Sequence, residues 1–126
     1  YGGIAVNVGN PHVIFFIDNI DKFNLEKIGP EIENHELFPE KCNVTLAKKI
    51  SPSLIKVKVW ERGAGLTKAC GTAACATAVA ANLKNISNSQ TEIEFSTGKL
   101  TVSIDEKHNI RMTGPVSEIK EIKINI

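Results

Sequence analysis

The stretch from residue 71 to residue 84 constrains the fold more than any other part of the chain. It has the length of a helix, and most of its side chains are small: Ala73, Ala74, Cys75, Ala76, Ala78, Ala80 and Ala81. Small side chains allow close packing on nearly every face, so we expect a sheet to wrap around this helix. Within it, Cys75 is expected to be a core residue.

Strand patterns precede and follow this helix. The clearest is the alternation of Ile55, Val57 and Val59 with lysines, which is typical of a half-buried strand. The predicted strands are residues 4–8, 13–17, 41–47, 55–59, 93–96, 100–104, 110–112 and 119–126. A mostly β order with one central helix predicts an α+β fold.

Two short helices are expected between the second and third strands. Phe23 to Ile28 has helical spacing and is followed by Gly29. Pro30 suits the first position of a second helix, which would run towards Leu37 and end at Pro39.

Composition excludes several function classes. The 126 residues predict one domain, and 15 basic against 14 acidic residues give a net charge of +1. Such a balance does not favour nucleic-acid binding. Three cysteines without a CxxC pair argue against a disulfide framework, and the dispersed histidines and cysteines argue against a metal site. No apolar run has the length of a membrane span, so we expect a cytoplasmic protein without a membrane partner.

Reactive side chains are concentrated between residues 60 and 76. A predicted strand delivers Glu61 and Arg62 into a turn that contains Gly63 and Gly65, and Cys70 stands directly before the alanine-rich helix. Unpaired N–H groups and the positive end of the dipole at a helix start favour a thiolate. This pattern predicts a cysteine nucleophile or a cysteine acid/base.

Four blocks of the sequence carry a family resemblance, and a weaker fifth is Met-Thr-Gly-Pro at residues 112–115. The four are Gly-Asn-Pro-His at residues 9–12, the block from Gly29 to His35 running into Phe38-Pro39, Asn-Val at 43–44, and residues 60–65 with 69–72. On these blocks, the chain resembles the C-terminal half of a diaminopimelate epimerase. The resemblance implies a curved, barrel-like mixed sheet around the central helix.

The resemblance also implies a reaction. Members of this family invert the α-carbon of diaminopimelate between the LL and meso forms, for lysine and peptidoglycan precursor synthesis. They use no pyridoxal phosphate and no metal. One cysteine thiolate removes the α-proton, and a second cysteine thiol protonates the opposite face. Without a cofactor, aimed donors in a dry site must stabilise the developing carbanion.

Site residues follow from the same motifs. Cys70 matches the catalytic cysteine of the second half, and Gly71 and Thr72 match residues whose backbone N–H groups face the reacting carboxylate. Glu61 and His12 match positions that help to set thiol protonation. The residues that match readers of the distal amino acid group are Asn10, Asn43 and Arg62.

The resemblance covers one half of a two-half protein. Residues 1–115 are expected to form the C-terminal half-domain, and residues 116–126 a last strand that pairs with the N-terminal half. That missing half would carry the partner cysteine, because neither Cys42 nor Cys75 is followed by Gly-Asn or Gly-Thr. We therefore expect this chain alone to be inactive; the sequence leaves open whether it forms a homodimer.

Other interpretations remain at this stage. A proline or hydroxyproline racemase or a phenazine-type isomerase would share the two-half fold, although Arg62 suits a second substrate carboxylate. A truncated copy would fold without doing chemistry. A cysteine hydrolase would need a base paired with Cys70, for which His12 is the candidate.

Overall fold

The fold is described from a computed structural model. The structure describes residues 3–36, 41–61, 65–67, 71–96, 98–107, 109–113 and 119–123. Two of the predicted site residues, Arg62 and Cys70, lie outside these ranges.

The described residues form nine strands and two helices. In chain order these are β1 (Gly3–Asn7), β2 (Pro11–Phe16), α1 (Leu25–Glu33), β3 (Asn43–Ser51), β4 (Leu54–Glu61), β5 (Gly65–Thr67), α2 (Gly71–Leu83), β6 (Gln90–Phe95), β7 (Gly98–Ile104), β8 (Asn109–Thr113) and β9 (Ile119–Lys123). The strand order is β1-β2-β3-β4-β6-β7-β8-β9, and β5 pairs with β4. Pairs β2/β3 and β4/β6 are parallel and the others antiparallel, so the sheet is mixed.

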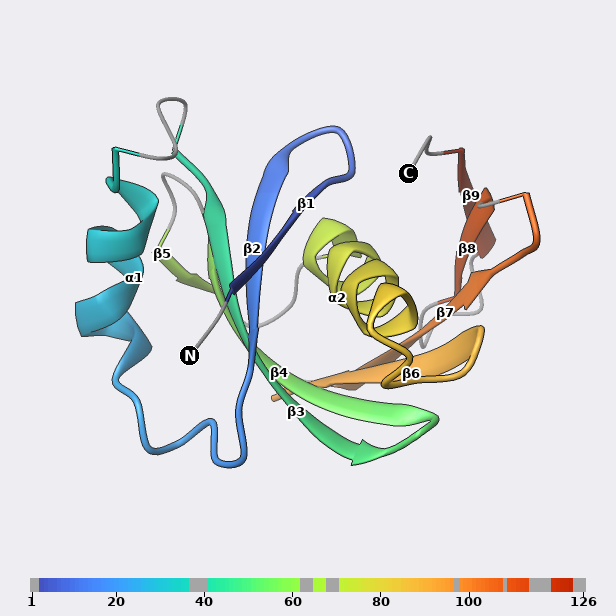
Figure 1. Ribbon diagram of the computed structural model, residues 1–126, viewed down its shortest axis with the longest axis horizontal. Helices are drawn as coiled ribbons and strands as arrows, with labels where there is room; N and C mark the ends of the chain where they lie inside the picture. Colours follow the sequence, from blue (N-terminus) through green and yellow to red (C-terminus); the bar gives the residue numbers. More distant parts are fainter. Residues whose placement is uncertain are drawn as a thin grey trace.

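The sheet curves around α2 (Figure 1). Every residue from Ala73 to Ala81 is buried, and α2 contacts β1, β2, β3, β6, β7 and β8. Ile55, Val57 and Val59 of β4 belong to the same apolar cluster as the helix, on the inner face of the sheet. The prediction of an α+β fold with a curved mixed sheet around one alanine-rich helix is confirmed. Cys75 is fully buried, as expected.

The second helix, α1, packs on the outer face of the sheet (Figure 1). Its buried residues are Leu25, Gly29 and Glu33, which recur every four residues and form one stripe. Asn24 caps the helix, since its side chain accepts a hydrogen bond of 3.0 Å from the backbone N–H of Glu26.

The prediction of two helices in this region was wrong, because α1 continues through Gly29 and Pro30. Proline inside a helix removes one backbone hydrogen bond and costs about 3 kcal/mol. Packing of the buried stripe against the sheet offsets that cost here. Pro30 also keeps a backbone role, since its carbonyl accepts a hydrogen bond of 3.0 Å from the N–H of Asn34.

The strand predictions agree with the structure in place but not in every length. The third predicted strand, 41–47, lies at 43–51, and β5 was not predicted. Strand β9 pairs with β8 through residues 109–113 and 119–123. Pairing of residues 116–126 with another half therefore stays a prediction.

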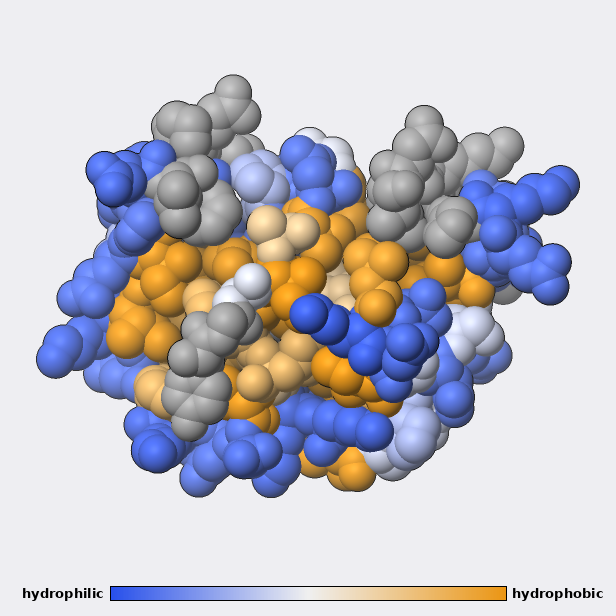
Figure 2. Space-filling view, viewed as in Figure 1, coloured by the Kyte–Doolittle hydropathy of each residue, from blue (hydrophilic) through white to orange (hydrophobic). Residues whose placement is uncertain are grey.

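Apolar side chains gather on one face of the molecule, between α1 and α2, and hydrophilic ones surround them (Figure 2). A cavity of about 250 Å³ beside α1 is lined by residues that include Phe15, Phe23, Ile28 and Leu46. Among the residues that the structure describes, neither helix has both the length and the apolar composition needed to cross a membrane.

Candidate active site

Three of the predicted site residues share one end of the sheet. Strand β2 runs from Pro11, β3 begins at Asn43, and β4 ends at Glu61. Strands β2 and β3 are parallel with His12 opposite Asn43, whereas β4 is antiparallel to β3 with Trp60 opposite Val44. His12, Asn43 and Glu61 therefore lie at the same end of three neighbouring strands.

The N-terminus of α2 reaches this same end. Asn10, in the turn between β1 and β2, has its Nδ2 atom 3.5 Å from Oγ1 of Thr72 in the first turn of α2. This distance is at the long limit of a hydrogen bond and would contribute little energy. It nevertheless fixes which parts of the chain meet: the β1–β2 turn faces the start of α2.

Asn10 also contacts His12. The Nε2 atom of His12 lies 3.1 Å from Oδ1 of Asn10, so Nε2–H donates to the amide oxygen. The NH₂ group of the same Asn10 side chain then faces Oγ1 of Thr72, to which it can donate. The imidazole is almost fully enclosed, with 1% of His12 exposed. Asn10 thus bridges a buried histidine and the first turn of the central helix.

Asn43 is also buried and has a structural contact. Its Nδ2 donates a hydrogen bond of 3.0 Å to the carbonyl of Pro11, which ties the start of β3 to the start of β2. Glu61 is half-buried and pairs with Gly65 of β5. On the alternating strand β4, Glu61 shares the inner face with Val57 and Val59.

Gly71, the first residue of α2, lies close to β8. A Cβ atom placed on Gly71 would be 3.1 Å from Cε of Met112, so the side chain of Met112 packs against the helix start. Sequence reasoning did not place Met112 in the site. The signal in the sequence is the Met-Thr-Gly-Pro block at residues 112–115.

The cysteines fall into two groups. Cys75 lies within α2 and Cys42 directly before β3, and both thiols are fully buried. Cys70 lies outside the described residues; in the sequence it directly precedes Gly71, where α2 begins. Arg62 likewise follows Glu61 outside the described residues.

The arrangement has a definite chemical character. The first N–H groups of a helix and its dipole favour an anion, such as a carboxylate. At this end of the sheet the structure gathers an imidazole, two amides and a carboxylate from residues 10, 12, 43 and 61, and the amide of Asn10 reaches the helix start. Such a set of donors and one acid suits proton transfer at a carbon beside a carboxylate.

Comparison with known sequences gives a consistent result. The family model described as diaminopimelate epimerase matches residues 4–119. A diaminopimelate epimerase of Pelagibacter ubique is 70% identical over 125 residues, covering 99% of this chain and 46% of that protein. One from Methanococcus maripaludis strain C6 is 46% identical over 127 residues, covering 100% of this chain and 46% of that protein. The chain spans about half the length of the curated relatives it matches.

Comparison with solved structures supports the fold. A PhzF-family phenazine biosynthesis protein of Enterococcus faecalis superposes with a TM-score of 0.61 at 16% identity, covering 82% of this chain and 36% of that one. A Bacillus anthracis protein of the same family gives 0.58 at 17% identity, covering 84% and 34%. At these identities the likeness concerns the fold alone. With the family model matching nearly its whole length, the chain belongs to the diaminopimelate epimerase family.

Proposed function

We propose that this chain is one half of an enzyme that interconverts LL- and meso-diaminopimelate in lysine and peptidoglycan precursor synthesis. One observation carries the proposal. Residues 12, 43 and 61 lie at the same end of three neighbouring strands, and Asn10 connects that end to Thr72 in the first turn of α2, which follows Cys70 in the sequence. The membership in the family supplies the substrate class.

Cys70 is the proposed proton-transfer group. The start of α2 favours the thiolate, which would take the α-proton of one stereoisomer. The electron pair left on the α-carbon delocalises into the neighbouring carboxylate. Backbone N–H groups of Gly71 and Thr72 would stabilise that charge without reorganisation. A thiol on the opposite face then delivers a proton, and the configuration inverts.

The other site residues have supporting roles in this proposal. Glu61 and His12 would adjust the protonation of the thiols, and Asn10 would keep the imidazole and Thr72 in register. Asn10, Asn43 and Arg62 would bind the distal amino acid group. The guanidinium of Arg62 is suited to a second carboxylate, which favours diaminopimelate over a proline-like substrate.

The second thiol must come from outside this chain. Cys42 and Cys75 are enclosed in the two apolar clusters. We therefore propose that residues 1–115 form the C-terminal half, that residues 116–126 pair with the other half, and that the partner cysteine lies there. No pyridoxal phosphate or metal takes part in this scheme. A reducing cytoplasm would keep Cys70 as a thiol.

The proposal is tested with the chain alone and with a chimera. In the chimera, the 125 matched residues of this chain replace the corresponding segment of the Pelagibacter ubique relative, which supplies the remaining part of a full-length enzyme. We expect the chimera to convert LL- into meso-diaminopimelate and the chain alone to be inactive. The matched control is the chimera with Cys75→Ala, which removes a buried thiol and should stay active.

Other outcomes would point elsewhere. A chimera that is folded but inactive on diaminopimelate and active on proline or hydroxyproline would favour the racemase alternative. Hydrolysis of an ester by the chain alone, lost on His12→Ala, would favour a cysteine hydrolase. Epimerisation by a preparation containing only these 126 residues would contradict the need for a second thiol from another half.

A further inference from the structure

Glu33 is the one buried acidic residue among those the structure describes. It lies in the last turn of α1, on the stripe that faces the sheet. Leaving a carboxylate without partners in such a place costs several kcal/mol. An apolar side chain would avoid that cost, so the carboxylate of Glu33 must be compensated by specific partners.

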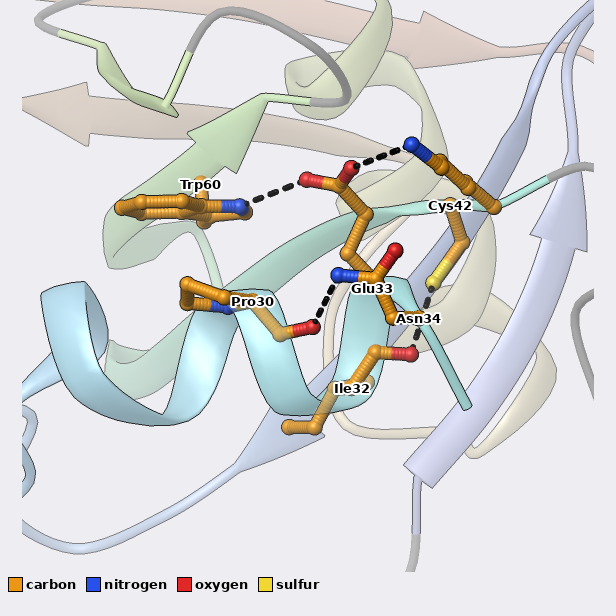
Figure 3. Close-up of polar contacts among 7 residues, drawn as sticks. Pro30, Ile32, Glu33, Asn34, Cys42 and Trp60 are labelled. Atoms are coloured by element: carbon orange, nitrogen blue, oxygen red, sulfur yellow. Dashed lines mark hydrogen bonds and ion pairs between the residues drawn. The ribbon is translucent and has the colours of Figure 1, made fainter. Parts of the chain in front are cut away.

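The carboxylate has two partners. The indole N–H of Trp60 donates a hydrogen bond of 2.8 Å to Oε1 of Glu33 (Figure 3). The ammonium of Lys41 lies 3.9 Å from Oε2. Lys41 has a φ of 65°, a conformation unfavourable for a residue with a side chain. The Lys41 side chain is half-exposed, so this pair contributes little energy, and the contact with Trp60 is the specific one.

Gly29, one helical turn before Glu33, contacts the same indole. A Cβ atom at Gly29 would lie 2.4 Å from Cγ and 2.5 Å from Cδ2 of Trp60. The indole therefore rests directly on the helix backbone, while its N–H reaches Glu33. Its position is set by contact at one side and by a directional hydrogen bond at the other.

The same turn of α1 also contacts the segment that leads into β3. The thiol of Cys42 lies 3.8 Å from the carbonyl of Ile32 (Figure 3). Cys42 and Trp60 are each one residue away from a candidate site residue, Asn43 and Glu61 respectively. The last turn of α1 is thus attached to the ends of two strands that carry the site.

Strand alternation transmits the position of Trp60 to Glu61. Successive side chains of a strand point to opposite faces, so the indole under α1 and the carboxylate of Glu61 on the inner face share one stretch of backbone. Rotation or displacement at Trp60 would move Glu61 with it. A shift of about 1 Å in a catalytic group can change a rate by about a hundredfold.

We propose that Glu33 is a positioning residue, which acts through Trp60 to set the place of Glu61 at the end of β4. This inference rests on the proposed epimerase function. It assigns to α1, which lies outside the curved sheet, a part in the chemistry that takes place inside it.

The first measurement tests the contact without any activity. Trp60 is the only tryptophan of the chain, so fluorescence of the 126-residue protein reports on its surroundings alone. Glu33→Ala should shift the emission to longer wavelength, because water replaces the carboxylate beside the indole. The matched control is Glu31→Ala, an exposed position on the same helix, which should leave the spectrum unchanged. An unchanged spectrum in Glu33→Ala would overturn the contact.

The second measurement uses the chimera and separates positioning from stability. Glu33→Ala should lower kcat about tenfold or more and change KM less than about threefold. Glu33→Gln keeps an oxygen that can accept from Trp60 and should return kcat to within about threefold of the parent. Trp60→Phe, which keeps an aromatic ring without the N–H, should lose activity as Glu33→Ala does. Glu31→Ala should match the parent.

The outcomes distinguish the two proposals. An inactive parent chimera would contradict the proposed function, and with it the role of Glu33. An active parent with Glu33→Ala within twofold of its kcat would overturn the positioning role alone. Equal losses in folded Glu33→Ala and Glu33→Gln would also overturn it, because the hydrogen bond to Trp60 would then not matter.

Discussion

Asn10 and Thr72 stand 62 residues apart in the chain, and their side chains lie 3.5 Å apart at the start of α2. This contact joins the turn between the first two strands to the helix that the sheet surrounds. The buried imidazole of His12 also contacts Asn10, so Asn10 connects it to the start of α2, which follows Cys70 in the sequence.

Removal of the Asn10 bridge should lower activity and also cost some stability. Asn10→Ala takes away the partner of His12 Nε2 and leaves a buried donor unsatisfied, an effect of about 1–3 kcal/mol. We expect kcat/KM of the chimera to fall about tenfold. Asn88→Ala, in the exposed loop at the other end of α2, is the matched control. Equal activity in the two variants would contradict a role for the bridge.

Gly29→Ala should destabilise the protein although alanine favours helices. Helix propensity alone would add up to about 1 kcal/mol of stability. The new Cβ would overlap the indole of Trp60 at 2.4 Å, and overpacking of this kind costs about 1–3 kcal/mol. Urea denaturation should show a lower midpoint. In a Trp60→Leu background the loss should shrink, and a loss of the same size there would exclude the indole as its cause.

Because the sheet encloses α2, substitutions at buried and exposed positions of this helix should differ clearly in their effect on the free energy of unfolding. Ala76 is fully buried, so Ala76→Leu should lower the free energy of unfolding by about 1–3 kcal/mol. Leu83 is 57% exposed at the end of the same helix, so Leu83→Ala should change it by less than about 0.5 kcal/mol. Thermal denaturation of both variants provides the measurement. Tolerance of leucine at position 76 would contradict close packing by the sheet.

The turn between β7 and β8 should give an acid-dependent contribution to stability. The backbone N–H of Asn109 donates to Asp105 at 2.9 Å, and this contact lowers the pKa of that carboxyl below 3.8. A folded-state pKa below the unfolded one gives stability that is present above pH 3.8 and is lost as the pH falls through the folded value. Asp105→Asn should therefore lower the melting temperature at pH 7 more than at pH 3.

The adjacent residue supplies the control for that turn. Glu106 is exposed, and Glu106→Gln should shift the melting temperature by a similar small amount at both pH values. A difference between wild type and Asp105→Asn that stays constant from pH 7 to pH 3 would show that the charge of Asp105 has no part in it.

The sequence predicts the centre of this fold better than its outer layer. Helix α2 was predictable because its small side chains favour a helix enclosed by strands. Gly29 and Pro30 are local stop signals and predict two helices, whereas the buried stripe of α1, which contacts Trp60 about thirty residues later, keeps the helix continuous. The short strand β5 has three residues, too few for a pattern.

The residues of the candidate site also differ in how far the sequence predicts them. Glu61 and Cys70 stand out because reactive groups and glycines are adjacent in the sequence. His12, Asn10 and Asn43 are ordinary residues by themselves, and family motifs singled them out. Glu33 could not be found, because a glutamate on a short amphipathic helix normally faces water. Its partner Trp60 is 27 residues away, so that contact exists only in the folded chain.

The most direct test of the account is α-proton exchange of diaminopimelate in deuterated water, measured with the chimera and its Cys70→Ala variant. We predict that the parent incorporates deuterium while it interconverts the LL and meso forms, and that Cys70→Ala no longer interconverts them although its circular dichroism is unchanged. Interconversion that persists in Cys70→Ala at the parent's rate would contradict the assignment of Cys70 as the proton-transfer group.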